Sequence, residues 1–189
     1  CLGRGHTRIV SWLPFFHDMG LVGVLLSSLV TGFTVHTIQP GDFLLHPSRW
    51  IELMSAVSAT LTVAPNFGYE LVARRMRTVP AHFHLSSLRA ALNGSEPVLR
   101  QTIDRFEELL APAGLRRGVI LPVYGLAENT LCVSFQMQAQ RDVDWVQGVR
   151  SIPSAGQPLP GTEVSIVNDS GEILTQGEIG EIAVSGPSV

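Results

Sequence analysis

The chain has 189 residues, of which 45% are hydrophobic and 15% are charged, a composition typical of a globular domain and not of a disordered chain. The formal net charge is −3 and all 13 basic residues are arginine. This balance argues against a nucleic-acid-binding protein, which would carry a basic face. The length allows one large domain, or one domain and a small second one.

The two cysteines, Cys1 and Cys132, are too few for a disulfide framework or a cysteine metal site, and they predict cytoplasmic residence. The most apolar stretch, residues 21–35, is shorter than the roughly 20 residues that a membrane span needs. It predicts a buried helix followed by a buried strand. The chain opens on cysteine and closes on a turn-like Gly-Pro-Ser-Val, so we expect it to be part of a longer protein.

Strand-like and helix-like segments alternate along the first part of the chain. Strands are expected at 8–12, 34–38, 60–63, 88–92 and 119–123, and helices at 18–29, 47–56 and 66–77. Asn66 is expected to cap the last of these helices. The alternation predicts an α/β fold with a mainly parallel sheet and flanking helices.

The clearest helix opens at Pro97. Its apolar residues recur every three or four positions and predict one buried face, made of Leu99, Ile103, Phe106 and Leu110. The charged residues between them are expected to face solvent: Arg100, Asp104, Arg105, Glu107 and Glu108.

The pattern changes after about residue 150. Glycines and prolines at 156, 158, 160 and 161 predict a linker. Strands are then expected at 162–167 and 179–184, with no helix between them. We therefore predict an α/β subdomain at 1–150 and the start of a β-rich subdomain at 151–189.

The first candidate motif follows a predicted strand, at the carboxyl end where open α/β sheets bind ligands. Residues 12–20 read Trp-Leu-Pro-Phe-Phe-His-Asp-Met-Gly and place His17 beside Asp18 at the turn into a helix. On composition alone, a core histidine paired with a carboxylate explains this motif as well as a catalytic role does.

Two further motifs occupy equivalent turns. Residues 92–97 read Leu-Asn-Gly-Ser-Glu-Pro, and the glycine lets a ligand approach the backbone, although an ordinary strand–turn–helix junction has the same pattern. In residues 122–130, Tyr124 precedes Gly125 and offers a flat ring for stacking on a base. Glu128 could hold a magnesium ion, or could simply favour a helix dipole.

The order and spacing of these motifs resemble those of the adenylate-forming superfamily, which contains acyl-CoA synthetases, luciferases and peptide-synthetase adenylation domains. The closest resemblance is to the fatty acyl-AMP ligases. It rests on residues 12–21, on Ala-Pro-Asn-Phe-Gly-Tyr-Glu-Leu at 64–71 followed by Arg74 and Arg75, on Asn-Gly-Ser-Glu-Pro at 93–97, on Tyr-Gly-Leu-Ala-Glu at 124–128, and on Gly-Glu-Ile-Gly-Glu-Ile at 177–182. The resemblance implies part of the large N-terminal domain of the acyl-CoA synthetase-like fold.

The resemblance also implies roles for particular residues. His17 would lie near the reacting carboxylate, and Glu128 would bind magnesium. The second motif would border the adenine pocket through Asn93, Gly94, Ser95, Glu96 and Pro97. Tyr124 would stack on adenine, and Gly125, Leu126 and Ala127 would pass close to the acyl-adenylate.

The implied reaction is attack of a fatty carboxylate on the α-phosphate of ATP, with Mg²⁺ as cofactor and an acyl carrier protein as acceptor. Segment 135–150 is shorter than the insertion typical of fatty acyl-AMP ligases, so an acyl-CoA or aryl-CoA synthetase remains an alternative. A non-catalytic adenylation-like scaffold is another. The family's phosphate loop, ribose-binding aspartate and catalytic lysine are missing here, so the chain alone is expected to be inactive.

Overall fold

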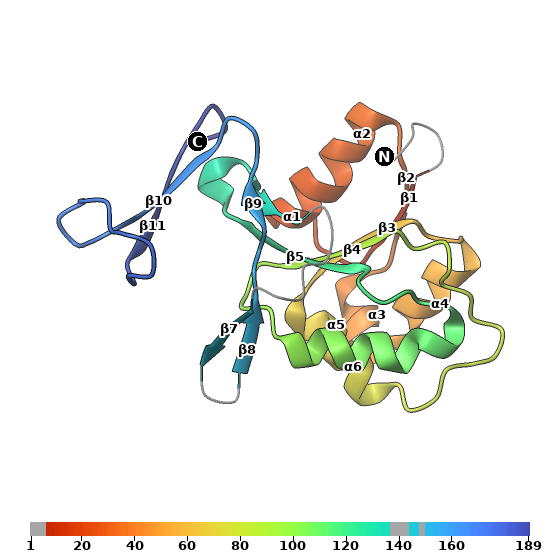
Figure 1. Ribbon diagram of the computed structural model, residues 1–189. Coiled ribbons are helices and arrows are strands. Elements are labelled where there is room, and N and C mark those ends of the chain that lie inside the picture. The colour runs from red at the N-terminus through yellow and green to blue at the C-terminus, as the bar shows by residue number, and fades with distance from the viewer. Residues whose placement is uncertain (1–6, 137–143, 148–149) are drawn as a thin grey trace.

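The computed structural model describes residues 7–136, 144–147 and 150–189, and its central feature is a twisted sheet (Figure 1). The strand order is β2-β1-β3-β4-β5-β6-β9. The bounds are β1 Arg8–Ser11, β2 Thr34–Thr37, β3 Leu61–Pro65, β4 Ala90–Gly94, β5 Ile120–Gly125, β6 Cys132–Phe135 and β9 Gln157–Pro158. The strands from β2 to β5 are parallel, and β6 and β9 are antiparallel additions, which confirms the mainly parallel sheet.

Helices cover both faces of this sheet. They are α1 Asp18–Gly20, the π-helix η1 Leu21–Leu26, α2 Ser27–Thr31, α3 Pro40–Leu45, α4 Ser48–Ala56, α5 Asn66–Arg75 and α6 Arg100–Leu110, with short 3₁₀ turns η2 Ala111–Ala113 and η3 Ala127–Asn129. In Figure 1, α1 and α2 lie on one side of the sheet and α3, α4, α5 and α6 lie on the other. The sequence analysis did not predict α3 or β6.

An aromatic cluster fills the space between the sheet and the larger helical layer. Trp12 stacks on Phe43 with ring centroids 4.0 Å apart, and Trp50 meets Tyr69 edge-on at 5.3 Å. Two polar atoms of the cluster also bond to the sheet. Tyr69 Oη donates to the Leu92 carbonyl oxygen at 2.7 Å, and Trp50 Nε1 donates to Thr62 Oγ1 at 3.1 Å. These bonds hold the helices in register with β3 and β4.

The segment expected to be a single buried helix at 18–29 is a continuous α–π–α run that ends at Gly32, whose φ of 74° is left-handed. One face of it is exposed: Leu29 is 72% and Val30 is 85% accessible. The expectation of full burial was therefore wrong for α2 and for much of η1, where Leu21 and Leu26 are exposed. The strand that follows, β2, is only partly buried and not fully buried as expected. An apolar run without a polar face does not tell from sequence which side meets the sheet.

Two expectations about helix side chains were also wrong. Glu107 was expected on the solvent face of α6 but is buried, and its Oε1 accepts a hydrogen bond from the Gly118 backbone N–H at 2.7 Å. Asn66 is the first residue of α5 and does not cap it. Its Oδ1 accepts instead from the Leu99 backbone N–H at 3.1 Å, at the start of α6.

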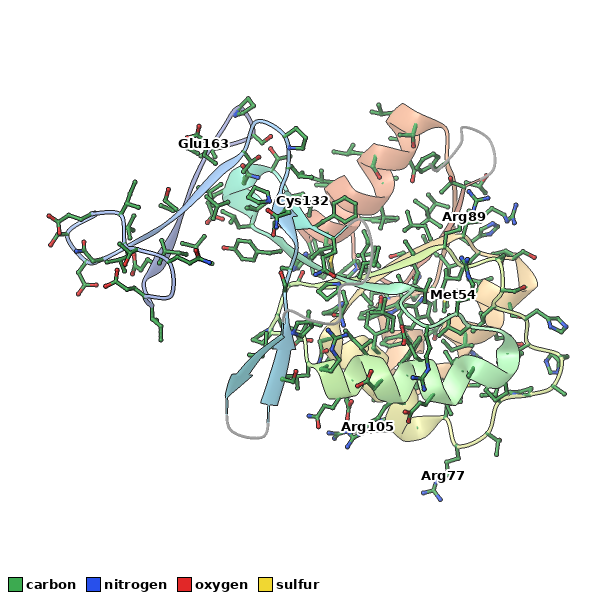
Figure 2. All side chains as sticks on the ribbon, in the orientation of Figure 1. Met54, Arg77, Arg89, Arg105, Cys132 and Glu163 are labelled. Carbon is green, nitrogen blue, oxygen red and sulfur yellow. The ribbon has the colours of Figure 1, made fainter. Side chains whose placement is uncertain are left out.

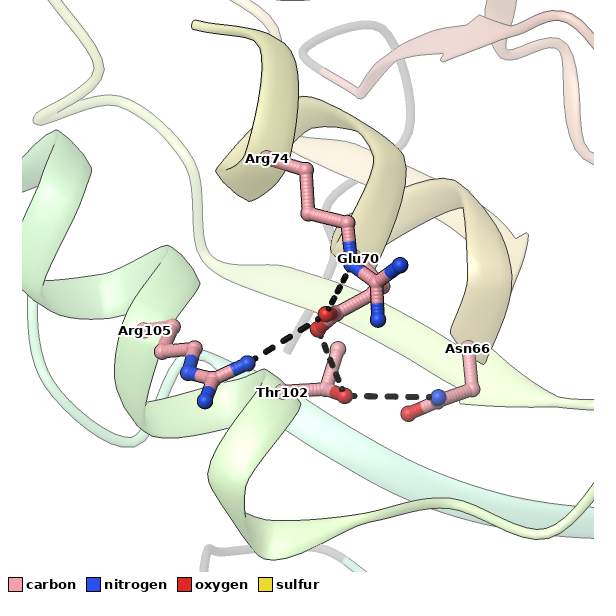
Figure 3. Close-up of polar contacts among 5 residues, drawn as sticks. All are labelled: Asn66, Glu70, Arg74, Thr102 and Arg105. Atoms are coloured by element: carbon pink, nitrogen blue, oxygen red, sulfur yellow. Dashed lines mark hydrogen bonds and ion pairs between the residues drawn. The ribbon is translucent and has the colours of Figure 1, made fainter. Parts of the chain in front are cut away.

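A charged network on the outer surface joins α5 to α6 (Figure 3). The Glu70 carboxylate accepts from Arg74 Nε at 2.6 Å, from Thr102 Oγ1 at 3.1 Å and from Arg105 Nη1 at 3.3 Å. Burial alone would raise the pKa of Glu70, but the hydrogen bonds from Arg74 and Thr102 and the two arginine charges outweigh it and lower the pKa.

The tail contains two further strand pairs. β7 Asp144–Gln147 and β8 Arg150–Pro153 form an antiparallel hairpin, and β10 Glu163–Val167 pairs with β11 Glu181–Ser185. The strands expected at 162–167 and 179–184 are confirmed. The expected linker is partly wrong, because Gln157 and Pro158 form β9 at the sheet edge beside β6.

The division at residue 150 stays a prediction. Most of segment 135–150, whose length bears on the acceptor, lies outside the described residues. None of the helices in the described residues is long and apolar enough to cross a membrane. Cytoplasmic residence stays a prediction.

Candidate active site

Because the strands from β1 to β5 are parallel, their carboxyl ends meet at one edge of the sheet, and the loops carrying the three motifs meet there too. The first and second motifs touch directly, since Ser95 Oγ donates a weak hydrogen bond to Met19 Sδ at 3.4 Å. The second and third motifs are equally close. A Cβ on Gly94 would lie 2.8 Å from the Val123 carbonyl oxygen, so only glycine fits between these strand ends.

His17 is the N-cap of α1, and half of its side chain is exposed. Its Nδ1 lies 2.6 Å from Asp18 Oδ1 and 3.2 Å from the Met19 backbone nitrogen. If Nδ1 accepted a hydrogen bond from the Met19 N–H, it would carry no proton. Its lone pair would then face the lone pairs of Asp18 Oδ1, which is unfavourable. Met19 N–H has a shorter bond to Asp18 Oδ1, at 2.7 Å, so we assign the Nδ1 proton to a bond with Asp18. This bond fixes the ring and leaves Nε2 for a ligand.

The second motif is held in an unusual backbone conformation. Ser95 has a left-handed φ of 65°, which is strained for a residue other than glycine. Glu96 is exposed, and its Oε1 accepts from the Phe67 backbone N–H at the start of α5. The motif is therefore tied to the Ala-Pro-Asn-Phe segment, 29 residues earlier in the chain.

Asn93 does not reach the surface of the site. It is fully buried and its Nδ2 donates to Asn66 Oδ1 at 3.4 Å. Asn66 in turn donates to Thr102 Oγ1 at 3.4 Å. This chain of side-chain amides joins the end of β4 to the first turns of α5 and α6, so Asn93 supports the loop from beneath. A direct nucleotide contact by Asn93 stays a prediction.

The third motif turns sharply after β5. The β5–β6 register shifts between Tyr124 and Gly125, and Glu128 follows on the short helix η3, where it is exposed. Asn129 is buried and pins the turn, because its Nδ2 donates to the Cys132 carbonyl oxygen at 3.0 Å. Thr130 has a left-handed φ of 63°. This strain and this bond fix where Glu128 sits.

An apolar cavity of about 280 Å³ lies between the sheet and the helix run α1–η1. Its polar lining comes from motif residues at the carboxyl edge, namely Asp18, Ser95 and Tyr124. Its other end is aliphatic and reaches Ile9 and Leu61, which are partners in the β1–β3 register. Leu61 lies two residues before Val63, about 6.6 Å deeper along the strand. The cavity therefore has a polar mouth and an apolar interior.

A second hollow of about 380 Å³ adjoins this cavity. It lies between the second motif, the end of β5 and the segment after β7, with Ser95, Glu96 and Pro97 on one wall and Ile152 and Pro153 on the other. Ser95, Val123, Tyr124 and Gly125 line both spaces. Leu126, Ala127 and Glu128 line neither space. They follow Tyr124 and Gly125 in the chain and lie outside both spaces.

The structure thus brings together most of the sequence-predicted residues, and it adds others. Sequence reasoning missed the cavity lining, which includes Met19, Leu131, Cys132, Phe135 and Leu159. Leu131, Cys132 and Phe135 come from β6 and the residue before it, and the others from distant parts of the chain. All are apolar or weakly polar, so no local pattern marks them. Burial raises the pKa of the Cys132 thiol, which keeps it protonated against the cavity wall.

No group of three or more His, Cys, Asp or Glu side chains in the described residues could by itself hold a metal ion. The exposed carboxylate of Glu128 is of the kind that could take part in a Mg²⁺ site, since Mg²⁺ bound with a nucleotide commonly takes only one or two carboxylates and completes its shell with phosphate oxygens and water.

A family model described as "AMP-binding enzyme" matches residues 2–189. The chain belongs to the AMP-binding enzyme family. The match spans nearly all of the chain, including the three motifs at the carboxyl edge, so the AMP-binding assignment and the geometry of the site concern the same residues.

Named relatives agree with this membership. A putative ligase of Mycobacterium tuberculosis is 36% identical over 200 residues, covering 96% of this chain and 37% of the relative. The medium-chain-fatty-acid–[acyl-carrier-protein] ligase JamA of Moorena producens is 35% identical over 201 residues, covering 95% of the chain and 34% of the relative. A solved structure from work on fatty acyl-adenylate ligases of E. coli and L. pneumophila superposes with a TM-score of 0.90 and 35% identity, covering 100% of this chain and 38% of that one. The chain therefore spans little more than a third of the length of these proteins.

Proposed function

We propose that the protein containing this chain activates a fatty acid as its acyl-adenylate, using ATP and Mg²⁺. The observation that carries the proposal is the pair of adjoining spaces, one apolar and one lined by the second and third motifs, that share Ser95, Val123, Tyr124 and Gly125. An acyl-adenylate has the same two parts, an aliphatic chain and a nucleotide, joined at one reacting centre.

The apolar cavity suits the acyl chain. Its polar residues lie only at the carboxyl edge, so a fatty acid would enter with its carboxylate near Asp18 and Ser95 and its tail toward Ile9 and Leu61. Burial of an aliphatic chain there stabilises the complex by about 0.8 kcal/mol per methylene. His17, whose ring Asp18 orients, would lie near the carboxylate and help to position it.

The second hollow suits the adenosine part. Tyr124 offers a ring face beside the bare backbone of Gly125, and Pro97, Ile152 and Pro153 provide apolar walls for a flat base. Only the edges of a base need polar partners, and Ser95 and Glu96 lie at this wall, whereas Gly94 does not line it. These residues would hold the nucleotide with its α-phosphate directed at the shared centre.

Glu128 would hold Mg²⁺ against the phosphates. The ion would reduce the charge repulsion between the ATP phosphates and the incoming carboxylate, and the protein would contribute chiefly by positioning the two reactants. The carboxylate oxygen forms a bond to the α-phosphorus as the bond to pyrophosphate breaks, so acyl-AMP and pyrophosphate are the products.

We further propose an acyl carrier protein as the acceptor. The relative JamA is named as a ligase of this kind. Hydrogen bonds of Asn66 and Phe67 with residues 93–99 join the two segments on which the resemblance to fatty acyl-AMP ligases rests, which supports this proposal.

The test uses the full-length enzyme with a fatty acid, ATP, Mg²⁺ and CoA, followed by chromatography of the products. Accumulation of acyl-AMP with little thioester supports the proposal. Rapid formation of acyl-CoA would assign the protein to the acyl-CoA synthetases instead. Absence of both products, and of ATP–pyrophosphate exchange in an enzyme that binds ATP, would favour a non-catalytic scaffold.

A further inference from the structure

The opposite edge of the sheet carries a second concentration of polar side chains, far from the motifs. Parallel strands begin at one edge, and here the strand starts are arginine-rich: Arg8 is the first residue of β1, and Arg89 immediately precedes β4. Arg116 lies shortly before β5. In Figure 2, Arg89 lies at the end of the sheet away from the β10–β11 pair.

These side chains line a common hollow of about 390 Å³, which among the described residues is lined by Arg8, Thr60, Ser86, Ser87, Arg89 and Arg116. Two of the guanidinium groups are fixed by backbone carbonyl oxygens. Arg8 Nε and Nη2 donate to Ser58 O at 2.9 and 2.7 Å, and Arg116 Nη2 donates to Leu88 O at 3.2 Å. A guanidinium has five N–H donors, so each of these arginines keeps donors for a ligand.

The charge of this hollow is not balanced by the residues that the structure describes. Among them no carboxylate lines the hollow, and no ion pair involves Arg8, Arg89 or Arg116. Other surface arginines do pair with carboxylates: Arg74 and Arg105 with Glu70, Arg117 with Glu108 and Arg49 with Asp42. Three unpaired cations gather at one place although the chain has a net charge of −3.

We propose that this hollow binds a phosphate group, as a site separate from the adenylate site. The planar arginine fork matches the oxygens of phosphate and forms paired, charge-assisted hydrogen bonds with them. The exposed Ser86 offers a hydroxyl at the rim. A hollow of this volume accommodates inorganic phosphate or the phosphate end of a small ester.

The site cannot serve the phosphates of the reacting nucleotide. The strands between the two edges have four to six residues, so the edges are separated by about 13–20 Å. Occupancy of the hollow would connect the starts of β1, β4 and β5, whose other ends carry the motifs. A phosphate bound there would therefore act on the strands that carry the motifs, and it would not contact the substrates.

The experiment compares phosphate binding by two full-length variants, Arg89→Gln and Arg77→Gln. Arg77 is a matched control because it is exposed on a different part of the surface, as Figure 2 shows. Calorimetric titrations use inorganic phosphate and, in a parallel arm, glycerol 3-phosphate. Both variants keep any phosphate binding in the adenylate site. A difference between their titrations therefore reports binding in the hollow.

We expect Arg89→Gln to lose a binding event, or to bind the probe about tenfold more weakly or worse, while Arg77→Gln matches the wild type. Arg89→Lys, which keeps the charge but not the fork, should bind with intermediate affinity and guards against a folding defect. Loss in the inorganic phosphate arm identifies the free anion, and loss only with glycerol 3-phosphate identifies an ester. Equal binding of both probes by all variants, or no binding outside the adenylate site in the wild type, overturns the proposal.

Discussion

Gly125 lies against the carbonyl oxygen of Leu131, so closely that a Cβ on residue 125 would overlap that oxygen. The contact closes the turn between β5 and β6, where the register shifts. Tyr124 lies just before the turn and Glu128 on the helix within it. The position of both depends on residue 125 having no side chain.

Replacing Gly125 with alanine should therefore damage the site more than the fold. A Cβ would push the Leu131 backbone away and shift the third motif, and a displacement of about 1 Å commonly costs about 100-fold in rate. ATP–pyrophosphate exchange by the full-length enzyme measures the loss. Gly41→Ala is the control, since a Cβ on Gly41, within α3, meets no atom within 4 Å. Equal exchange rates in the two variants would show that the contact is not needed.

Glu128→Gln should abolish exchange while leaving the melting temperature unchanged. The amide keeps the size of the side chain but removes the charge that would hold Mg²⁺. Exchange is measured across a magnesium titration, and Glu52→Gln, on an exposed position of α4, serves as the control. Unaltered exchange by Glu128→Gln at limiting magnesium would remove the metal role from this residue.

Leu61→Phe should shorten the range of acids that the enzyme accepts. The larger ring would fill the deep end of the apolar cavity, opposite Ile9. Excluding two methylenes costs about 1.6 kcal/mol, or roughly tenfold in kcat/KM for the longest acids, while short acids are unaffected. Exchange rates over a series of fatty acids measure this. Leu45→Phe, at a side chain 69% exposed, should leave the profile as it is. If the exchange rate falls equally for fatty acids of all chain lengths, the cavity does not hold the acyl chain.

Glu70 should contribute to stability only when it is ionised. Its pKa is lowered in the folded protein, so the contribution is present above the usual glutamate value of about 4.5 and is lost as the pH falls through the lower folded value. Glu70→Gln should reduce the melting temperature of the full-length enzyme at pH 7, by an amount corresponding to about 1 kcal/mol or less, and should flatten its decline below pH 4.5. If the melting temperatures of the wild type and the variant change in parallel between pH 3 and 6, this role is contradicted.

The sequence predicted the elements that have strong local signals. Ile103, Phe106 and Leu110 form a buried face of α6, with the spacing that the sequence predicted. The helix begins at Arg100 and not at Pro97, so Leu99 precedes it and is only half-buried. The strand expected at 88–92 lies two residues later, as β4. Before β4 the chain forms a turn, in which the Leu88 N–H donates to the Leu85 carbonyl oxygen at 3.0 Å. The strand begins only after this turn, and tertiary packing decides where the turn ends.

What the sequence could not show were contacts between distant segments. Asn66 looked like the cap of its own helix, yet it serves α6 and Asn93, because folding brings another N–H group within its reach. Pro158 looked like a linker residue, although proline is tolerated at a sheet edge such as β9. The apolar cavity had no signature at all, since its walls combine a few residues from each of several elements that are far apart in the sequence.

The four residues that line both spaces, Ser95, Val123, Tyr124 and Gly125, restrict how this enzyme could change its chemistry. A substitution at any of them would change the walls of both spaces, which we propose to hold the acid and the nucleotide. Positions such as Leu61 and Leu159 border the apolar cavity only, whereas Ile152 and Ala155 border the other hollow only. On the proposed function, substitutions at the first set would change the accepted acid in small independent steps and leave the nucleotide side unchanged.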